Sequence, residues 1–430
     1  MGDAGNAAWM LTSASLVFLM TPGVAFFYGG MVRAKAVLNM LMLSTAALAV
    51  TGVVWTFWGW SIAYAGTDIG GIFGDPATGF LLKDTMVATD GVWGSVDGGA
   101  DAAYPPSINV AFQVTFAMIT VALITGALAE RIKFSTWMIF VALWITFVYA
   151  PMAHMVWNHG LLSPDGAISQ AIGAAAHDFA GGTVVHINAA TAALVTVLII
   201  GKRKGFAKEP FRPHNVPFVM LGAFLLWFGW FGFNAGSAFA ANGVAGYTWV
   251  STTAATSAAT LGWLFTEKIR SGHYTAMGAA SGMVAGLVAI TPAADVVSPL
   301  WAMVLGFIAG ILCCFAVGLK FKLGYDDSLD VVGVHGVGGL TGTILIGFFG
   351  EGTGLFAGGD YKQLLVQIVI ALVAILYSGV LTAIISFALE KTVGWRVTEA
   401  QEVGGVDLAD QGERAYDFAG TASSILKGVK

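Results

Sequence analysis

The sequence predicts an all-α membrane protein that crosses a lipid bilayer many times. Of its 430 residues, 57% are hydrophobic and only 10% are charged, whereas ordinary soluble proteins carry about a quarter charged residues. Apolar stretches recur between the charged residues, and each is long enough for the roughly 20 residues of a membrane-spanning helix. Such long and continuous stretches do not fit the short, alternating strands of a membrane barrel.

Composition excludes several other classes of protein. The formal net charge is −5 and no basic block occurs, so we do not expect a nucleic-acid partner. The two cysteines, Cys313 and Cys314, are adjacent in an apolar stretch and are interpreted as packing residues. The sequence contains no Ser-His-Asp, HExxH or phosphate-binding-loop pattern, so we expect no enzyme, no metal site and no cofactor.

Ten apolar stretches lie between the charged residues, and one of them can hold two spans. The stretch 213–266 is best divided at Ala241-Asn242-Gly243, because Asn-Gly favours a turn. We therefore predict eleven transmembrane helices. They fall within residues 4–32, 36–67, 102–129, 134–164, 179–201, 213–266 (two helices), 271–294, 296–319, 331–350 and 363–389.

Lys and Arg predict the orientation, because cytoplasmic loops carry an excess of both. When the connections are assigned to alternate sides, one side has only Lys83 and Lys362. An N-terminus outside and a C-terminus inside follow from this asymmetry. We expect a transmembrane domain of residues 1–389 and a cytoplasmic tail of residues 390–430, either solvated or bound to a partner. The basic side collects Arg33, Lys35, Arg131, Lys133, Lys202, Arg203, Lys204, Lys208, Arg212, Lys268, Arg270, Lys320 and Lys322.

Two histidines lie inside predicted helices, where an ionisable group is costly and is a candidate for function. His186 and His335 fall in the fifth and tenth helices. Two successive sets of five helices must be inverted relative to each other, and a two-fold axis in the membrane plane would bring these histidines together. We therefore predict an inverted 5+5 repeat plus one extra helix. The alternative is two unrelated core histidines, each bonded to a carbonyl. Asp178 and Asp330, which precede the two helices, are expected to cap helix amides.

Several motifs resemble those of the ammonium transporter (Amt/MEP/Rh) family. The resemblance runs along the whole chain and implies eleven helices, an inverted repeat, a homotrimer in the cell membrane and one narrow pore in each subunit. The motifs are residues 22–30 (PGVAFFYGG), 127–131 (ALAER), 153–157 (AHMVW), 178–190 (DFAGGTVVHINAA), 230–237 (WFGFNAGS) and 330–336 (DVVGVHG).

The resemblance also implies roles for individual residues. An outer ammonium site would consist of Phe112, Phe116, Trp157 and Ser237. Phe116 and Phe233 would form a stacked gate, His186 and His335 would line a dry pore, and Asp178 would hold the outer vestibule together. The tail resembles the family's tail, which implies a PII-type signal protein as a cytoplasmic partner. Gln411 departs from the pattern, since many members have His there.

Elementary chemistry fits ammonium or its analogue methylammonium as the substrate. An aromatic face stabilises a partly desolvated cation by about 1 to 2 kcal/mol, and a Ser oxygen can accept one N–H bond. K⁺ donates no hydrogen bonds, so a dry constriction offers it nothing in place of its water shell. Ammonia, ammonia with a relayed proton, and ammonium all remain open as the species that is moved.

Three other functions also remain open at this point. A haem protein would use the two histidines as axial ligands and would show a Soret band. A membrane sensor would signal through its tail to a separate partner, because no signalling domain follows Lys391. A neutral-gas channel of the Rh type would not need the aromatic site.

Overall fold

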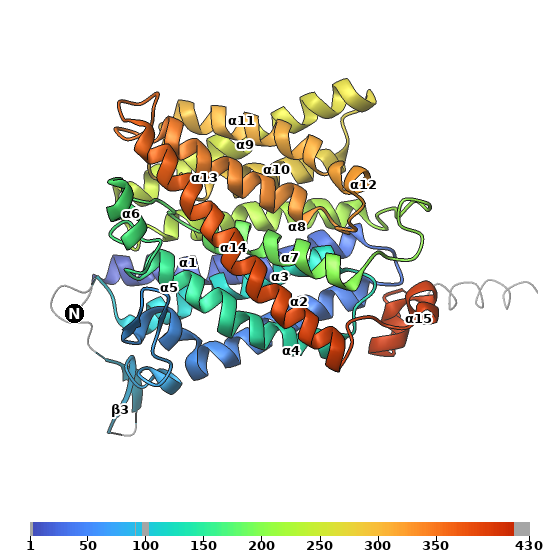
Figure 1. Cartoon of the computed structure of the whole chain (residues 1–430), viewed down its shortest axis with the longest axis horizontal. Helices are drawn as coiled ribbons and strands as arrows, with labels where there is room; N and C mark the ends of the chain where they lie inside the picture. Colours follow the sequence, from blue (N-terminus) through green and yellow to red (C-terminus); the bar gives the residue numbers. More distant parts are fainter. Residues whose placement is uncertain (1–2, 91, 97–102, 417–430) are drawn as a thin grey trace, which may run out of the picture.

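The chain folds into a bundle of long helices whose axes are roughly aligned. The N-terminus and the end of the described chain lie at opposite ends of the bundle (Figure 1). The computed structural model describes residues 3–90, 92–96 and 103–416. We name the end near Ala4 the N-terminal face and the end near Trp395 the tail face. Within the described residues, nine helical segments are long and apolar enough to cross a membrane. They are Ala4–Met31, Val37–Gly59, Pro106–Leu128, Phe134–Trp157, Gly182–Ile200, Val216–Ala235, Pro299–Leu323, Val332–Phe349 and Tyr361–Thr392.

Two further helices belong to the same bundle. α9 (Gly243–Ser271) packs against α10 (Ala276–Ile290) and against α11 (Pro299–Ala316). α9 is long but less apolar, and its buried side includes Thr248, Thr252 and Thr256, whereas α10 is apolar but shorter. The side chain of Asn242 caps α9 by accepting the Ala245 N–H at 3.1 Å. The predicted division of 213–266 at this Asn is therefore confirmed.

Several long helices contain a π-helical turn, a feature that often lies near functional sites. α2 (Val37–Val54) continues into η1 (Trp55–Gly59) and η2 (Ser61–Ala65), and η4 (Ile145–Tyr149) joins α4 (Phe134–Trp144) to α5 (Ala150–Trp157). η5 (Gly182–Ile187) leads into α7 (Asn188–Ile200), α8 (Val216–Trp230) ends in η6 (Phe231–Ala235), and η7 (Val332–Gly336) leads into α13 (Val337–Phe349). The remaining helices are α1 (Ala4–Met31), α3 (Pro106–Leu128), α6 (Ala167–Ile172), α12 (Leu319–Leu323), α14 (Tyr361–Thr392), α15 (Glu399–Gly404) and η8 (Asp407–Gln411).

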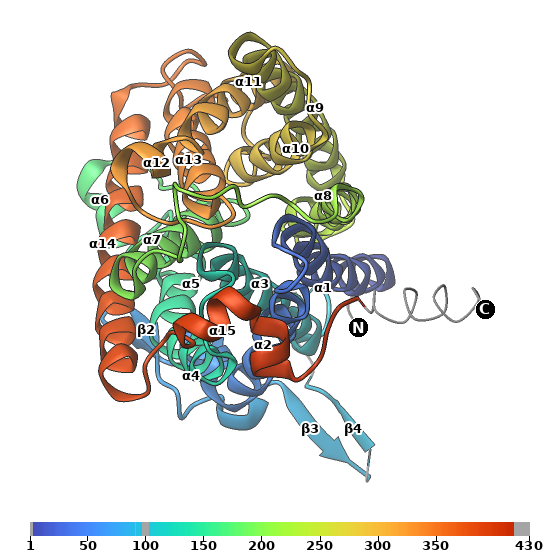
Figure 2. The same ribbon diagram turned by 90° about the vertical axis from the view of Figure 1, so that its right-hand side faces the viewer.

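The connection between α2 and α3 contains small β-hairpins, which the sequence analysis did not predict. β1 (Asp68–Ile69) pairs with β2 (Phe73–Gly74), and after the short turn η3 (Phe80–Leu82), β3 (Met86–Thr89) pairs with β4 (Val92–Ser95), both antiparallel. The β3–β4 hairpin extends sideways beyond the outline of the bundle (Figure 2).

Close packing brings the two halves of the bundle together. α1 packs along α8, and a Cβ atom at Gly222 would lie 2.3 Å from the backbone nitrogen of Phe27, so no side chain fits there. The helix pairs that carry the histidines run antiparallel, since η5 contacts α13 while η7 contacts α7. An inverted arrangement of these segments, as the sequence predicts, is consistent with both contacts.

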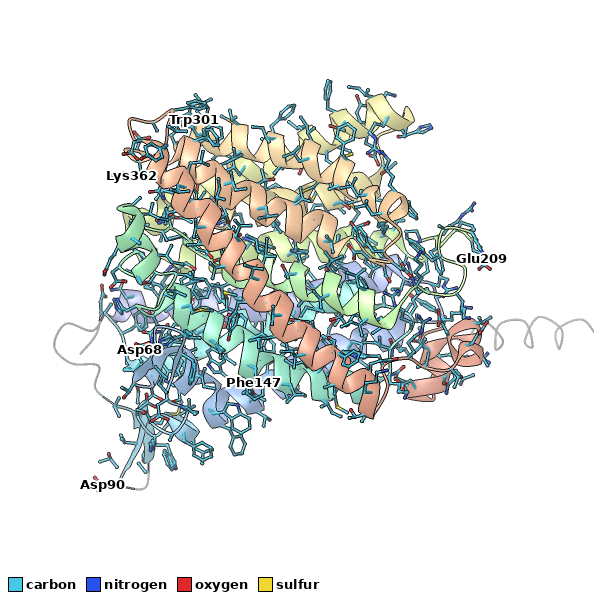
Figure 3. All side chains as sticks on the ribbon, viewed as in Figure 1. Asp68, Asp90, Phe147, Glu209, Trp301 and Lys362 are labelled. Carbon is cyan, nitrogen blue, oxygen red and sulfur yellow. The ribbon has the colours of Figure 1, made fainter. Side chains whose placement is uncertain are left out.

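The flanks of the bundle are apolar, as the composition requires. Phe147 points outward from the flank (Figure 3) and is 53% exposed. Other exposed apolar side chains are Leu221, Phe224, Phe228, Leu261, Phe265, Leu372, Leu376, Val380 and Ile384. A surface of this kind is stable in lipid rather than in water.

The described part of the tail is docked on the tail face, so the expectation of a solvated tail is wrong for residues up to Tyr416. Trp395 is completely buried, and Lys133 N–H donates to its carbonyl at 2.8 Å. Asp407 caps α2 by accepting the N–H groups of Leu38 at 3.1 Å and Asn39 at 2.8 Å. A carboxylate in the tail therefore satisfies backbone amides that a helix start leaves free. Residues 417–430 of the predicted tail lie outside the described residues.

Candidate functional site

A cavity of about 350 Å³ opens at the N-terminal face, and we name it the aromatic cavity. Three of the four predicted site residues, Phe116, Trp157 and Ser237, line it. The fourth, Phe112, is completely buried and packs edge-on behind Phe116, with ring centroids 4.8 Å apart. The other lining residues are Tyr64, Tyr104, Asn109, Gln113, Asn158, Phe179 and Phe239.

Trp157 is held at the C-terminal end of α5 by one hydrogen bond. Its indole N–H donates to the backbone carbonyl of Asp178 at 2.8 Å, and its ring stands edge-to-face with Phe116 at 6.0 Å. The hydroxyl of Ser237 donates to the carbonyl of Phe233 at 2.8 Å. The Ser237 oxygen therefore keeps lone pairs with which it can accept a hydrogen bond from a ligand.

The polar members of the cavity wall were not singled out from the sequence. The Tyr64 hydroxyl donates to the side-chain oxygen of Gln113 at 2.8 Å, which fixes both side chains. Asn158 donates to the carbonyl of Tyr64 at 3.2 Å. Gln113 directly follows Phe112 in the stretch 111–116. Its position between two predicted site residues is the feature of the sequence that could have identified it.

Two stacked phenylalanine rings form the floor of the cavity. The ring centroids of Phe116 and Phe233 are 4.1 Å apart with an interplanar angle of 21°, and both side chains are buried. Phe116 lines the aromatic cavity and Phe233 lines a second space deeper in the bundle, so the stacked rings lie between the two.

A narrow space that we name the histidine lumen lies behind this floor. It is bounded in part by Phe233, Trp230, Tyr28, His186 and His335, and its volume of about 10 Å³ is close to that of one water-sized molecule. The Nδ1 atoms of His186 and His335 lie 3.3 Å apart, within hydrogen-bond distance. Within the described residues, Nε2 of His186 has no hydrogen-bond partner.

This geometry decides between the interpretations of the two histidines. They bond to each other rather than to separate carbonyls, and the 3.3 Å separation leaves no room for a haem iron between them. One Nδ1 must donate and the other must accept, so each ring is left with Nε2 for other contacts. His154, in contrast, is a structural residue as expected, because it bonds to the Ala63 carbonyl at 3.3 Å and to Asp68 at 2.9 Å.

Asp178 caps η5, as predicted, and does not line the aromatic cavity. Its carboxylate accepts the N–H groups of Gly181, Gly182 and Thr183 at 2.8, 2.6 and 2.8 Å, and also the Thr183 hydroxyl. The carboxylate therefore fixes the lead-in to the helix that carries His186, while the Asp178 carbonyl fixes Trp157.

The prediction that Asp330 caps the second helix is wrong, because Asp327 does so. Asp327 accepts the N–H groups of Val331 at 3.0 Å and Val332 at 2.7 Å. Asp330 directly precedes the helix in a left-handed conformation (φ 67°), and its carboxylate pairs with Lys320 at 2.6 Å. An N-cap side chain reaches the N2 and N3 amides from an extended backbone, and the left-handed backbone of Asp330 does not provide that conformation.

Comparison with known proteins decides the family. The sequence model described as Ammonium Transporter Family matches residues 8–416. The chain belongs to the ammonium transporter family. Ammonium transporters of Mycobacterium tuberculosis and Aquifex aeolicus are 52% and 48% identical to it, covering 99% and 97% of this chain and 92% and 94% of theirs. These relatives are named as transporters, which confirms the prediction that the protein is not an enzyme.

Solved structures of the ammonium transporter family have the same fold. The crystal structure of Candida albicans Mep2 matches with a TM-score of 0.84 at 31% identity, covering 97% of this chain and 94% of that one. A structure described as a sensor Amt protein matches with a TM-score of 0.83 at 28% identity, covering 94% and 98%.

A buried ion-pair network lies at the tail face of this ammonium transporter family member. Asp326 pairs with Arg131 at 2.9 Å and with Arg203 at 2.9 Å. Burial alone would raise the pKa of Asp326, but hydrogen bonds from Arg203 and the charges of both arginines lower it. The network joins the connections that follow α3, α7 and α12, and so fixes the loops on which the tail rests.

Proposed function

We propose that this protein moves ammonium or ammonia across the cell membrane through a narrow pore in each subunit. The observation that carries the proposal is that three features lie next to one another in order: the aromatic cavity, the stacked phenylalanine rings and the histidine lumen. Phe116 lines the aromatic cavity and stacks on Phe233, and Phe233 in turn packs beside His186 at 6.2 Å between ring centroids. Membership of the ammonium transporter family supports the same reading.

The aromatic cavity would recruit the cation from the outer solution. Trp157 and Phe116 offer π-faces, and a cation held over such a face gains about 0.5 to 2 kcal/mol as it loses water. Ser237 would accept one N–H bond, with Phe112 acting from behind as support for the Phe116 ring. A cavity built in this way favours a cationic substrate over the neutral gas of an Rh-type channel.

The stacked rings and the histidine lumen would then select the substrate. Phe116 and Phe233 form the gate, and His186 and His335 line the pore beyond it. K⁺ would have to shed its water in a lumen that holds about one small molecule and would find no full set of oxygen ligands there. Ammonia or ammonium can instead form a hydrogen bond with Nε2 of His186, which has no hydrogen-bond partner within the described residues.

The remaining predictions belong to the same proposal. We infer eleven transmembrane helices from the nine apolar segments together with α9 and α10, with the N-terminal face outside and the tail face inside. We further infer a homotrimer, a transmembrane domain to residue 389, and a tail from residue 390 that meets a PII-type protein. The concentration of Lys and Arg on the tail face supports this orientation.

The test is charge movement on addition of ammonium to proteoliposomes, with a check that the oligomer is intact. We expect His186→Ala to abolish the ammonium current because it removes one member of the hydrogen-bonded histidine pair in the lumen. His335→Glu keeps a titratable group at this depth, so conduction should persist with changed selectivity. His159→Ala is the control, since His159 is exposed and lies outside the pore. A folded His186→Ala protein with the parent's currents and the parent's exclusion of K⁺ would overturn the pore role of the histidines.

A further inference from the structure

The segment that supports Trp157 is held by side chains rather than by secondary structure. Residues 174–181, between α6 and η5, form no helix or strand. The side-chain amide of Gln367 on α14 accepts the His177 N–H at 2.8 Å and donates to the His177 carbonyl at 2.8 Å. Phe179 N–H donates to the carbonyl of Pro292 at 3.2 Å. Two separate elements, α14 and the turn that follows α10, therefore hold this short stretch of backbone.

The His177 side chain adds one further connection. Its Nε2 lies 2.8 Å from Oδ1 of Asp295, on the turn that follows α10. The two side chains remain 26% and 17% exposed, so protons can exchange with the solution at the N-terminal face. The function described above uses neither of these residues.

Two groups of the aromatic cavity depend on this segment. The Asp178 carbonyl, next to His177, accepts the indole N–H of Trp157, and Phe179 lines the cavity wall. A shift of residues 177–179 would therefore move an aromatic face away from the cation. The His177–Asp295 pair adds a side-chain restraint to the backbone hydrogen bonds that Gln367 makes with His177.

We propose that His177 and Asp295 are positioning residues that hold Asp178 and Trp157 in the cation-binding geometry and make affinity depend on the pH of the outer solution. This inference rests on the proposed function, because it assigns the aromatic cavity to ammonium. His177 and Asp295 do not touch the substrate.

The charges around the pair give the direction of the pH dependence. Burial lowers the pKa of His177, but the hydrogen bond and charge of Asp295, with a further contribution from Asp178, outweigh it and raise the pKa. Among the neighbouring titratable and charged groups, Tyr247 on α9 is acted on by the charges of both Asp295 and Glu351, which follows α13, while Lys362 of α14 approaches Gly173 at the end of α6. His177 is therefore protonated below the ordinary His value of about 6.5, and its interaction with Asp295 weakens as the pH rises through the raised pKa of His177.

The first measurement is the half-saturation concentration of the ammonium current at external pH values from about 5.5 to 8.5. In the parent protein we expect it to rise with pH by about threefold to tenfold, as the partial loss of one cation–π contact would produce, while the maximal current changes less. In Asp295→Asn the rise should occur at lower pH, because the group that raises the His177 pKa is gone. In His177→Gln, which keeps a hydrogen-bond donor without titrating, the dependence should disappear. The ratio of ammonium to ammonia changes with pH in the same way for all variants, so it does not contribute to differences between variants at one pH.

Asp165→Asn is the matched control. His159 and Asp165 form a second His–Asp pair at the N-terminal face, 2.7 Å apart and exposed, and neither lines the cavity. Its pH profile should match that of the parent. An Asp295→Asn profile that coincides with the parent, or a His177→Gln profile that keeps the pH dependence, would overturn the proposal.

A spectroscopic measurement separates this inference from the proposed function. With 5-fluorotryptophan at all 14 Trp positions, the resonance missing in Trp157→Phe identifies Trp157. This resonance should shift with pH in the parent and not in His177→Gln. A parent protein without ammonium current at any pH would refute the proposed function alone, whereas a Trp157 resonance insensitive to pH would refute the positioning role alone.

Discussion

Trp157 shows how one side chain depends on residues far away in the sequence. Its ring lines the aromatic cavity, while its indole N–H bonds to Asp178, 21 residues later. An indole N–H that is buried usually finds such a partner, and here the partner fixes the ring angle. The affinity of the cavity therefore depends on the backbone of another element.

Replacing Trp157 with Leu tests the cavity at this scale. We expect the half-saturation concentration of ammonium or methylammonium current to rise by about threefold to thirtyfold, since a cation–π contact contributes about 0.5 to 2 kcal/mol. Folding should survive because Leu fills part of the space and the lost N–H leaves a carbonyl near water. Trp93→Leu is the control, because Trp93 is 75% exposed on the β3–β4 hairpin. Unchanged saturation in Trp157→Leu would remove Trp157 from the site.

At the residue scale, motif resemblance found the aromatic residues, and position inside apolar helices found the histidines, but neither found the polar wall. The structure places Phe116, Trp157 and Ser237 on the aromatic cavity and His186 and His335 on the histidine lumen. Tyr64 and Gln113 were missed because their meeting joins the end of α2 to α3 through a tertiary contact. Such contacts leave no periodic signal in the sequence.

At the scale of elements, each histidine-bearing helix begins with a carboxylate cap. Asp178 starts η5 and Asp327 starts η7, and the two lead-ins lie on antiparallel elements. The sequence predicted the helices and the first cap, because apolar length and a preceding Asp are local signals. It misplaced the second cap by three residues, because neither the left-handed backbone of Asp330 nor its ion pair with Lys320 leaves a local signal in the sequence. The β-hairpins were missed because their strands are short.

The Asp327 cap should respond to pH. Burial raises the pKa of Asp327 to about 6, with Lys320 opposing and Asp330 adding to the rise. The folded protein thus binds this proton more tightly than the unfolded chain, so this residue's contribution to the free energy of unfolding falls by about 3 kcal/mol as the pH rises from about 4 to about 6. The midpoint of thermal unfolding, measured in detergent from pH 4 to pH 7, should show this fall in the parent. It should be reduced in Asp327→Asn, and identical slopes in the two proteins would contradict the assignment.

For the whole molecule, the lipid environment and the distribution of charged residues explain why most of the helices were predictable from the sequence. Apolar length located the helices because lipid leaves the backbone few other ways to satisfy its hydrogen bonds. The docked tail was not predictable, because its acidic composition is typical of a solvated segment. Three of its carboxylates instead accept backbone N–H groups, namely Glu402 from Lys204, Asp407 from Asn39 and Asp410 from Phe134. The tail is therefore hydrogen-bonded to the backbone near the ends of several helices.

A partner that displaces or clamps these loops would therefore act on the proposed pore. The tail face carries exposed Lys and Arg side chains that would attract such a partner. The connection between α7 and α8 extends furthest from the bundle near Glu209 (Figure 3), and Lys202, Lys204, Lys208 and Arg212 are exposed along it. We expect a native PII-type protein, at saturating effector, to bind this face and stop the ammonium current.

Charge reversal at one exposed lysine tests where that partner binds. Lys208→Glu should weaken binding by about 1 kcal/mol, roughly fivefold, because an exposed charge contributes modestly. The difference should shrink at high salt, where such charges are screened. Lys83→Glu makes the same change beside η3 at the N-terminal face, which a cytoplasmic protein does not reach in the proposed orientation, so its binding should equal that of the parent. Equal loss of binding in both variants would show that net charge rather than this loop attracts the partner, and absence of any complex in a pull-down would refute the PII proposal while leaving transport to its own test.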